Sequence, residues 1–232
     1  MLHPAAQLFK GCHLLHLSKM SSECLLKFYL LLWFTLHFCH ITASYQYQCE
    51  ARQLMSSIRF ARRIRSRVQA LLLHYKEQEL GDSKFEDRNL MLKTLPSLNT
   101  DYFTWLHMQH TERLDMAVRD LHIFLILLDA NREQIVEEKN GQMDMLTRSM
   151  YNVQLDVKDL ILHVKSQLNK MNSQRHSPSG QTVTQQPPPP SLLRPRLSWH
   201  KRLQGYVVLR DLERYLGKVV RDFILLKSKY RK

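Results

Sequence analysis

The sequence has little glycine and proline: only 6 of its 232 residues are Gly and 8 are Pro, and four of the prolines are consecutive. It also lacks repeated alternation of apolar and polar residues bounded by Gly or Asn-Gly turns, the usual pattern of strands joined by hairpins. Its apolar content of 44% is ordinary for a globular protein. These features together predict an all-α protein.

The residue patterns of common catalytic sites are missing too. The chain has no H-E-x-x-H, G-x-S-x-G, P-loop or Cys-x-x-Cys motif. His107 and His110 are spaced to lie one helical turn apart, where they would suit a metal ion, but scattered surface histidines are the more ordinary explanation. We therefore predict that the protein is not an enzyme and uses no cofactor or metal.

The N-terminal region contains an apolar block, Leu25–Cys39. Its length fits the hydrophobic part of a signal peptide and falls short of the ~20 residues of a membrane-spanning helix. Because many residues precede the block, Met20 suits an ordinary leader better than Met1 as the start, and both starts stay open. We predict a signal peptide with an upstream extension over residues 1–43, of which 20–43 is the functional leader; a retained signal anchor is the alternative.

Cleavage at this boundary would leave a secreted, extracellular domain over residues 44–232. Four cysteines are few, and cleavage would remove all of them except Cys49. A single cysteine cannot form an internal disulfide, so Cys49 is either a free thiol or a site of intermolecular pairing. No Asn-x-Ser/Thr sequence occurs, and N-glycosylation is not expected.

Apolar residues three and four positions apart indicate four long amphipathic helices. The predicted helices cover about residues 50–79, 110–139, 142–171 and 199–230. In the last helix this spacing includes Leu209 and Leu212, and Ser198 is a suitable N-cap. The charged residues between its apolar positions, such as Arg210 and Asp222, suit a solvated face.

The lengths of the connections predict how the helices run. The turn at Asn140-Gly141 is so short that the second and third helices must be antiparallel neighbours. The other two connections, one of them the Ser-, Gln- and Pro-rich segment 172–197, are each about 25 residues. Extended, each would cover ~80 Å and so return along a ~45 Å helix. This order predicts an up-up-down-down four-helix bundle with two long crossover loops, the fold of the long-chain helical cytokines.

The net charge of +13 favours an anionic partner. Part of this charge is concentrated on the first helix, at Arg59, Arg62, Arg63 and Arg67. We expect these arginines to steer a protein partner or to bind heparan sulfate; an ordinary solvated helix face is the alternative. No nucleic-acid-binding motif is present, and nucleic acid is not an expected partner.

Two tryptophans are candidate contact residues. Trp199 opens the last helix among polar and charged neighbours, which is typical of an interface anchor; capping of the core is the alternative. Trp105 lies in the first long loop near Phe103 and Leu106, where it either contacts a partner or covers the bundle. The predicted receptor-binding residues are Trp199, Leu197, Arg202, Trp105, Arg59, Arg62, Arg63 and Arg67.

Three groups of residues also resemble a known family. The groups are Leu95-Pro96 with Trp105 and Glu112-Arg113-Leu114; Met145-Leu146 with Leu155-Asp156-Val157-Lys158-Asp159-Leu160; and Leu197-Ser198-Trp199 with Tyr206, Leu212 and Val220–Leu226. They are similar to the loop, third-helix and last-helix patterns of the interleukin-27 alpha subunits, in the interleukin-6/interleukin-12 family of long-chain helical cytokines. The similarity covers roughly residues 50–230, and the motifs are specific only in combination.

The resemblance implies a secreted cytokine subunit without enzymatic activity. Such a subunit forms a heterodimer with a soluble cytokine-receptor-like beta subunit. It then binds the interleukin-27 receptor alpha chain and the shared signal transducer of the interleukin-6 family, which triggers JAK/STAT signalling and regulates immune responses. The acidic tract that the family usually carries between its third and last helices is absent here. A secreted heparin-binding or carrier helical protein without a receptor role is the alternative function.

The resemblance also implies three contact surfaces. The end of the last helix, with the first long loop, would bind the beta subunit. The exposed faces of the first and third helices would bind the receptor alpha chain. In the family the tryptophan that opens the last helix contacts the shared transducer, and this role falls on Trp199.

Overall fold

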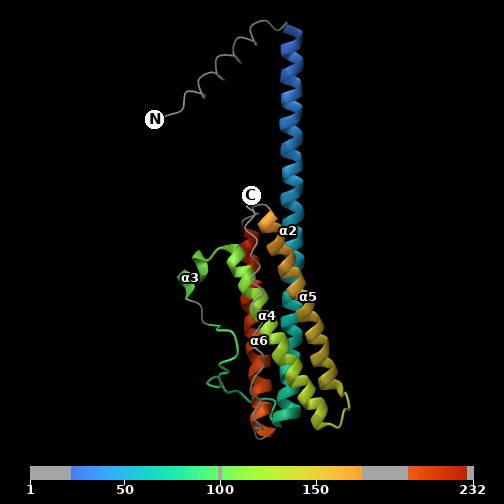
Figure 1. The fold of residues 1–232 in the computed structure, drawn as a ribbon, viewed down its shortest axis with the longest axis vertical. Helices are drawn as coiled ribbons and strands as arrows, with labels where there is room; N and C mark the ends of the chain where they lie inside the picture. Colours follow the sequence, from blue (N-terminus) through green and yellow to red (C-terminus); the bar gives the residue numbers. More distant parts are fainter. Residues whose placement is uncertain (1–21, 99–100, 174–197, 229–232) are drawn as a thin grey trace. The chain divides into compact units, whose positions relative to one another are not determined.

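The computed structural model describes residues 22–98, 101–173 and 198–228, and the regular structure in these ranges is entirely helical (Figure 1). The helices are α2 (Ser22–Leu80), α3 (Tyr102–His107), α4 (His110–Glu138), α5 (Met145–Ser173) and α6 (Ser198–Ser228). The chain divides into two compact units, residues 1–50 and residues 51–232.

The described residues of the first unit belong to the N-terminal part of α2. Apolar side chains are exposed here, among them Leu26, Trp33 and Phe38. No helix within the described ranges is both long enough and apolar enough to cross a bilayer. The signal peptide expected at residues 1–43 stays a prediction.

The start of α2 differs from the sequence-based expectation. The helix is continuous from Ser22, whereas the spacing of apolar residues predicted a start near residue 50. No glycine or proline occurs between residues 40 and 50, so nothing in the local sequence interrupts the helix there. At its other end α2 stops at Leu80, and Gly81 follows with a φ of +74°, as expected of a glycine that terminates a helix.

The other three long helices begin and end within three residues of the predicted bounds. The short helix α3 was not predicted, because six residues are too few to show a helical period. Its N-cap is Asp101, whose side chain accepts a hydrogen bond from the Thr104 N–H at 3.0 Å. That bond lowers the pKa of the Asp101 carboxyl.

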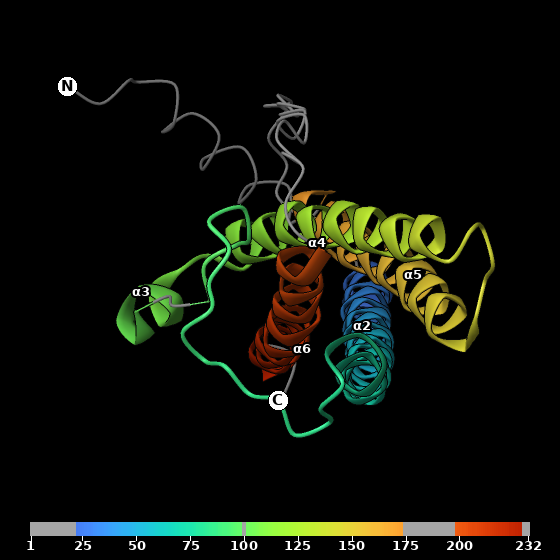
Figure 2. The same ribbon diagram turned by 90° about the horizontal axis from the view of Figure 1, so that it is seen from below.

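Within the second unit, the helix directions are those predicted from the connection lengths. The C-terminal part of α2 and α4 run one way and α5 and α6 the other, so the fold is an up-up-down-down four-helix bundle (Figure 1). Seen from below, α2 and α6 form one layer and α4 and α5 the other (Figure 2). The turn between α4 and α5 has positive φ at Asn140 (54°) and Gly141 (82°), a conformation that Asn and Gly adopt more readily than other residues.

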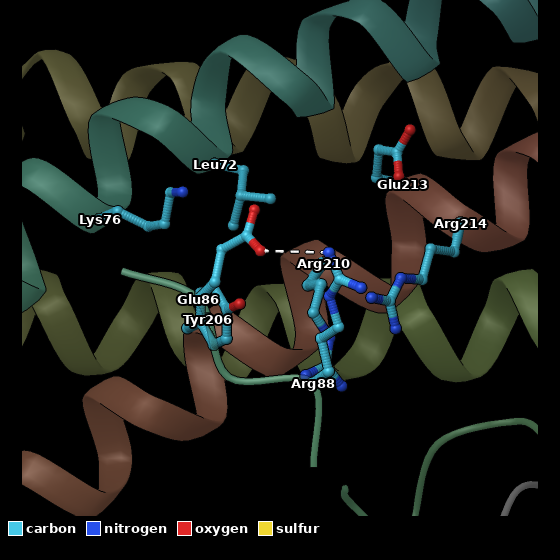
Figure 3. Close-up of a pocket in the computed structure, with 8 residues that line it drawn as sticks. All are labelled: Leu72, Lys76, Glu86, Arg88, Tyr206, Arg210, Glu213 and Arg214. Carbon is cyan, nitrogen blue, oxygen red and sulfur yellow. Dashed lines mark ion pairs between the residues drawn. The ribbon is translucent and has the colours of Figure 1, made fainter. Parts of the chain in front are cut away.

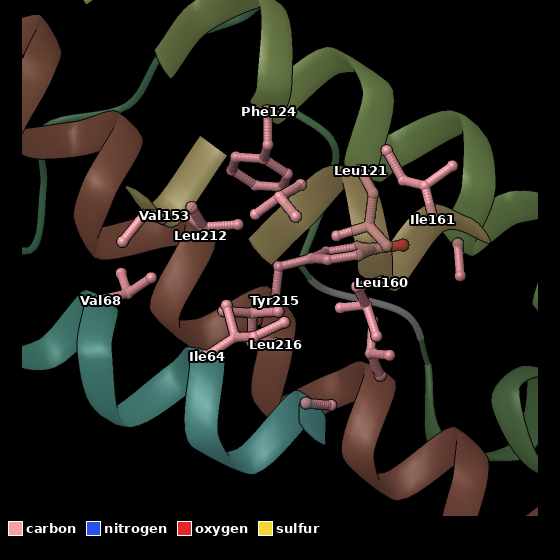
Figure 4. Close-up of a cluster of buried hydrophobic side chains, with 14 of the residues drawn as sticks. Ile64, Val68, Leu121, Phe124, Val153, Leu160, Ile161, Leu212, Tyr215 and Leu216 are labelled. Atoms are coloured by element: carbon pink, nitrogen blue, oxygen red, sulfur yellow. The ribbon is translucent and has the colours of Figure 1, made fainter. Parts of the chain in front are cut away.

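The core lies between the four long helices, each of which contributes apolar side chains (Figure 4). Those at its centre, each at most 2% exposed, are Ile64, Val68, Leu121, Phe124, Val153, Leu160, Leu212 and Leu216. Tyr215 is fully buried among them and donates its hydroxyl hydrogen to Asp120 Oδ2 at 2.7 Å. Burial and the nearby Asp120 charge raise the pKa of the Tyr215 phenol well above its ordinary value.

The helices approach closely near Gly205 of α6. A Cβ at this position would overlap the hydroxyl of Tyr75 and the amide of Asn131. The absent side chain lets the Tyr75 hydroxyl reach the Arg202 carbonyl oxygen, to which it donates at 3.0 Å. Glycine is therefore required here by packing, although it lies within a helix.

Candidate interaction surfaces

The first long crossover loop is attached to α6 by three side chains that we call the Trp105 clasp: Trp105, Arg113 and Asp222. The Trp105 indole N–H donates to Asp222 Oδ1 at 2.7 Å, and Arg113 Nη1 donates to the same oxygen at 3.2 Å. Arg113 Nη2 donates to the carbonyl oxygens of Trp105 and Met108. The guanidinium carbon lies 4.8 Å from the centre of the indole ring, within the range of a cation–π contact.

The charged members of the clasp are buried. The side chains of Arg113 and Asp222 are 2% and 3% exposed, which corrects the expectation of a solvated face at Asp222. Burial raises the pKa of the Asp222 carboxyl, while the hydrogen bonds from Trp105 and Arg113 act in the opposite direction. An unpaired buried carboxylate would be costly, so each donor is needed to keep this part of the loop in place.

The outer side of α3 is apolar and accessible. Tyr102 and Phe103 are 62% and 69% exposed, and Leu106 is 42% exposed. Trp105 itself is only half-buried, but its polar atom is bonded to α6. Around Trp105, the apolar side chains that are most accessible to a partner are thus those of its neighbours Tyr102, Phe103 and Leu106.

Arg210 of α6 forms a second attachment of the same loop. It is buried, which corrects the expectation that it lies on a solvated face. Its guanidinium donates to the carbonyl oxygens of Asp87 and Leu90, the latter at 2.7 Å. It also donates to Asp211 Oδ1 at 2.8 Å and lies 5.6 Å from the centre of the Tyr206 ring. Arg210 and the Trp105 clasp therefore attach two separate parts of the loop to the same helix.

A cleft is formed by α2, α6 and this loop (Figure 3). It is lined by Leu72, Lys76, Glu86, Arg88, Tyr206, Arg210, Glu213 and Arg214. Several of its polar groups serve contacts within the chain. Lys76 donates to the Phe85 carbonyl oxygen at 3.2 Å, and Glu213 accepts from Arg65 at 2.7 Å and from Gln69 at 2.9 Å. The cleft is thus mainly a product of how the loop is attached.

Trp199 lies in the first turn of α6, at the end of the bundle opposite the Trp105 clasp. It is 48% exposed, and its indole N–H has no hydrogen-bond partner within the part of the chain that the structure describes. Its predicted neighbour in the receptor-binding set, Leu197, lies outside the described residues. The exposure of Trp199 is what an interface residue requires, and its role as a contact stays a prediction.

Arg202, which was also predicted to contact a receptor, has partners within the chain. Its guanidinium forms ion pairs with Glu79 at 3.7 Å and with Glu138 at 3.8 Å. Its side chain remains 38% exposed. Arg202 therefore links α6 to the C-terminal ends of α2 and α4, and only part of it is accessible to a partner.

The same end of the bundle contains the N-cap of α5. Asp144 accepts a hydrogen bond from the Thr147 N–H at 2.8 Å and pairs with the Lys139 ammonium group. Lys139 also lies 3.3 Å from Glu79 Oε1. Although desolvation acts to raise it, the pKa of Asp144 is lowered to about 2 by the hydrogen bonds from Lys139 and Thr147. This network fixes the tight turn between α4 and α5.

The four arginines predicted as contacts on α2 are all exposed. Arg67 pairs with Asp156 of α5, whereas Arg59, Arg62 and Arg63 form no ion pair with any described residue. The predicted contact residues therefore lie in three separate places: two opposite ends of the bundle and the outer side of α2.

His107 and His110 are the pair whose spacing would suit a metal ion. His107 Nδ1 lies 2.8 Å from the Phe103 carbonyl oxygen. No group of three side chains suited to hold a metal ion occurs in residues 22–98, 101–173 and 198–228.

Comparison with known proteins gives two findings. The Ciliary neurotrophic factor family model matches residues 42–232. Interleukin-27 subunit alpha of Sus scrofa is 25% identical over 182 residues, which cover 75% of this chain and 74% of that relative. The family match includes the whole of the second unit, with Trp105, Trp199 and the α2 arginines.

Proposed function

Because the chain belongs to the Ciliary neurotrophic factor family, whose members are helical cytokines and not enzymes, we propose that it is a secreted subunit of a two-chain cytokine. In this proposal the chain forms a heterodimer with a soluble, cytokine-receptor-like subunit. The pair then brings cell-surface receptor chains together and so activates JAK/STAT signalling. The similarity to a protein named as an interleukin subunit supports the two-chain form.

The observation that carries the proposal is the exposed Trp199 at the start of α6. Large aromatic side chains that are accessible and surrounded by polar residues are typical centres of binding energy in protein interfaces. We assign Trp199 the contact with the shared signal transducer. The partly accessible Arg202 in the next turn would lie at the rim of this contact.

Two further surfaces complete the assembly. The apolar outer side of α3, with Tyr102, Phe103 and Leu106, suits the soluble subunit because it presents aromatic rings on a loop that is fixed to the bundle. The outer sides of α2 and α5 suit the private receptor chain, in keeping with the resemblance of this sequence to interleukin-27 alpha subunits. Arginines on α2 would then steer association more than they would add to affinity.

The first test is co-expression with candidate soluble receptor-like subunits. We expect secretion to rise with the right partner and the two chains to be recovered together from the medium. That medium should raise STAT phosphorylation in cells that carry the receptor chains. If no soluble subunit is recovered with the chain and none raises its secretion, the two-chain proposal is wrong.

The second test replaces Trp199 with alanine. Secretion and pairing should be unchanged, and STAT phosphorylation should fall at least about tenfold, the effect of losing one dominant interface residue. Ile126→Ala is the matched control, because Ile126 is an exposed apolar residue (37%) on α4, which belongs to none of the three proposed surfaces. Full signalling by Trp199→Ala, or an equal loss with both variants, would contradict the assignment.

A further inference from the structure

The C-terminal half of α2 contains an unusual run of cationic residues. Between residues 51 and 76 there are six arginines and no Asp or Glu. A salt bridge within one helix needs an oppositely charged residue three or four positions away. Because this stretch contains no Asp or Glu, its arginines cannot form salt bridges with one another's neighbours in the stretch. Any neutralising carboxylate must come from a neighbouring helix.

Among the described residues, carboxylates of the neighbouring helices neutralise two of the six arginines. Arg65 pairs with Glu213 of α6 at 2.7 Å, and Arg67 pairs with Asp156 of α5. These two arginines are on the flanks of α2, where it packs against the helices on either side. Each carboxylate is thereby occupied and is held away from the outer side of α2.

The other four arginines form the surface that we call the arginine face: Arg52, Arg59, Arg62 and Arg63. All four are exposed, and none forms an ion pair with a described residue. In a helix of 3.6 residues per turn these positions lie within about a third of the circumference, on the side away from the buried Leu54, Ala61 and Val68. The row extends for about 16 Å along the helix axis at ~1.5 Å per residue.

Such a surface is unfavourable for the isolated protein. Arg59 is three residues before Arg62 and four before Arg63, and like charges at these spacings oppose helix formation. A linear polyanion that lies along the helix would contact several of these arginines at once. Guanidinium groups bind sulfate-like anions through two parallel N–H···O bonds, which suits arginine better than lysine for this task.

We propose that the arginine face binds a sulfated glycosaminoglycan chain of the heparan sulfate type. This assignment rests on the proposed secretion of the protein, because such chains are met outside the cell. The site holds the cytokine at the cell surface independently of Trp199, which lies on another helix at one end of the bundle. Binding depends on the release of counterions from the polyanion, so it weakens steeply as salt is raised.

The test uses the purified protein on immobilised heparin, with elution by a salt gradient, and compares two variants of equal charge. Arg59→Gln with Arg63→Gln removes two charges from the arginine face. Arg148→Gln with Lys158→Gln removes two charges from α5, where both side chains are exposed and form no ion pair with a described residue. Circular dichroism checks that both variants keep the helical fold.

We expect the α2 variant to elute at clearly lower salt than the α5 variant and to bind soluble heparin about tenfold more weakly at physiological salt. Its plot of log affinity against log salt should lose about two units of slope, one for each arginine. Hyaluronan, which carries carboxylates and no sulfates, should compete poorly.

Equal elution of the two variants would overturn the proposal, because net charge alone would then explain retention. Equal competition by hyaluronan would overturn sulfate recognition. If the α2 variant keeps heparin binding but loses receptor binding, the face is a protein-docking surface and the proposal is wrong. The pairing test and the Trp199→Ala test use a protein with an intact arginine face, so failure of the heparan sulfate proposal leaves their results unchanged and the two proposals fail separately.

Discussion

Trp105 and Trp199 have similar settings in the sequence and different ones in the structure. Trp105 lies near the end of the first crossover, close to the start of α4, and Trp199 opens α6 after the second crossover. Trp105 is bonded to the buried Asp222, whereas Trp199 is half exposed and its indole N–H has no partner among the described residues. The comparison shows what decides the role of such a tryptophan. Trp105 attaches the loop because its N–H bonds to a buried carboxylate, whereas Trp199 has no such partner among the described residues and stays accessible.

The largest expected effect comes from breaking the charged pair behind Trp105. Replacing Asp222 with Leu, or Arg113 with Met, leaves the other member of a buried ion pair without its partner. Such losses lower the free energy of unfolding by about 3–5 kcal/mol. Urea denaturation followed by circular dichroism measures the change.

The double variant Arg113→Met with Asp222→Leu sharpens this test. It removes both charges together, and we expect it to lose clearly less stability than either single variant, because no unpaired charge remains. If the double variant is as unstable as the sum of the single ones, the pair does not act as the unit described here.

A smaller effect is expected from the tryptophan side of the clasp. Trp105→Phe keeps most of the ring but removes the N–H that donates to Asp222, and a lost hydrogen bond to a charged group costs about 1.5–3 kcal/mol. The loss should be accompanied by faster amide hydrogen exchange in α3, since its attachment to α6 is weakened. Unchanged exchange in residues 102–107 would mean that Arg113 alone holds the loop.

Strong acid should weaken the Asp144 network, at the end of the bundle opposite the Trp105 clasp. The folded-state pKa of Asp144 is about 2, below its ordinary value of 3.8, so its contribution to stability is present above pH ~4 and is lost as the pH falls towards 2. Asp144→Asn keeps an N-cap but removes the pair with Lys139, and should abolish this pH-dependent part, which is under about 1 kcal/mol for an accessible pair. Thermal unfolding at pH 2, 4 and 6 tests this, and an unaltered pH dependence in the variant would contradict it.

The fold was predictable where local patterns decide it. The spacing of apolar residues specified α4, α5 and α6, and Asn140-Gly141 specified the tight turn that fixes the helix directions. The start of α2 was missed because the helix continues through residues without a local interruption. The exposure of Trp199 was likewise predicted from its polar and charged neighbours in the sequence.

The clasp could not be read from the sequence, because its members come together only in the folded chain. Asp222 accepts from Trp105, 117 positions earlier, and from Arg113, 109 positions earlier. By helical spacing alone Asp222 and Arg210 belong to a solvated face, yet both are buried by the loop that passes over α6. Similarly, nothing local distinguishes Arg67, which pairs with Asp156 of α5, from Arg63, which forms no ion pair with a described residue.

The difference between Trp105 and Trp199 is tested most directly by measuring the free energy of unfolding of two variants, Trp199→Ala and Trp105→Ala. We predict that Trp199→Ala stays within about 0.5 kcal/mol of the parent protein, as for other accessible residues, whereas Trp105→Ala is less stable by at least about 2 kcal/mol. A loss of several kcal/mol with Trp199→Ala, or equal losses with both variants, would show that Trp199 is part of the core and would contradict its role as the exposed contact.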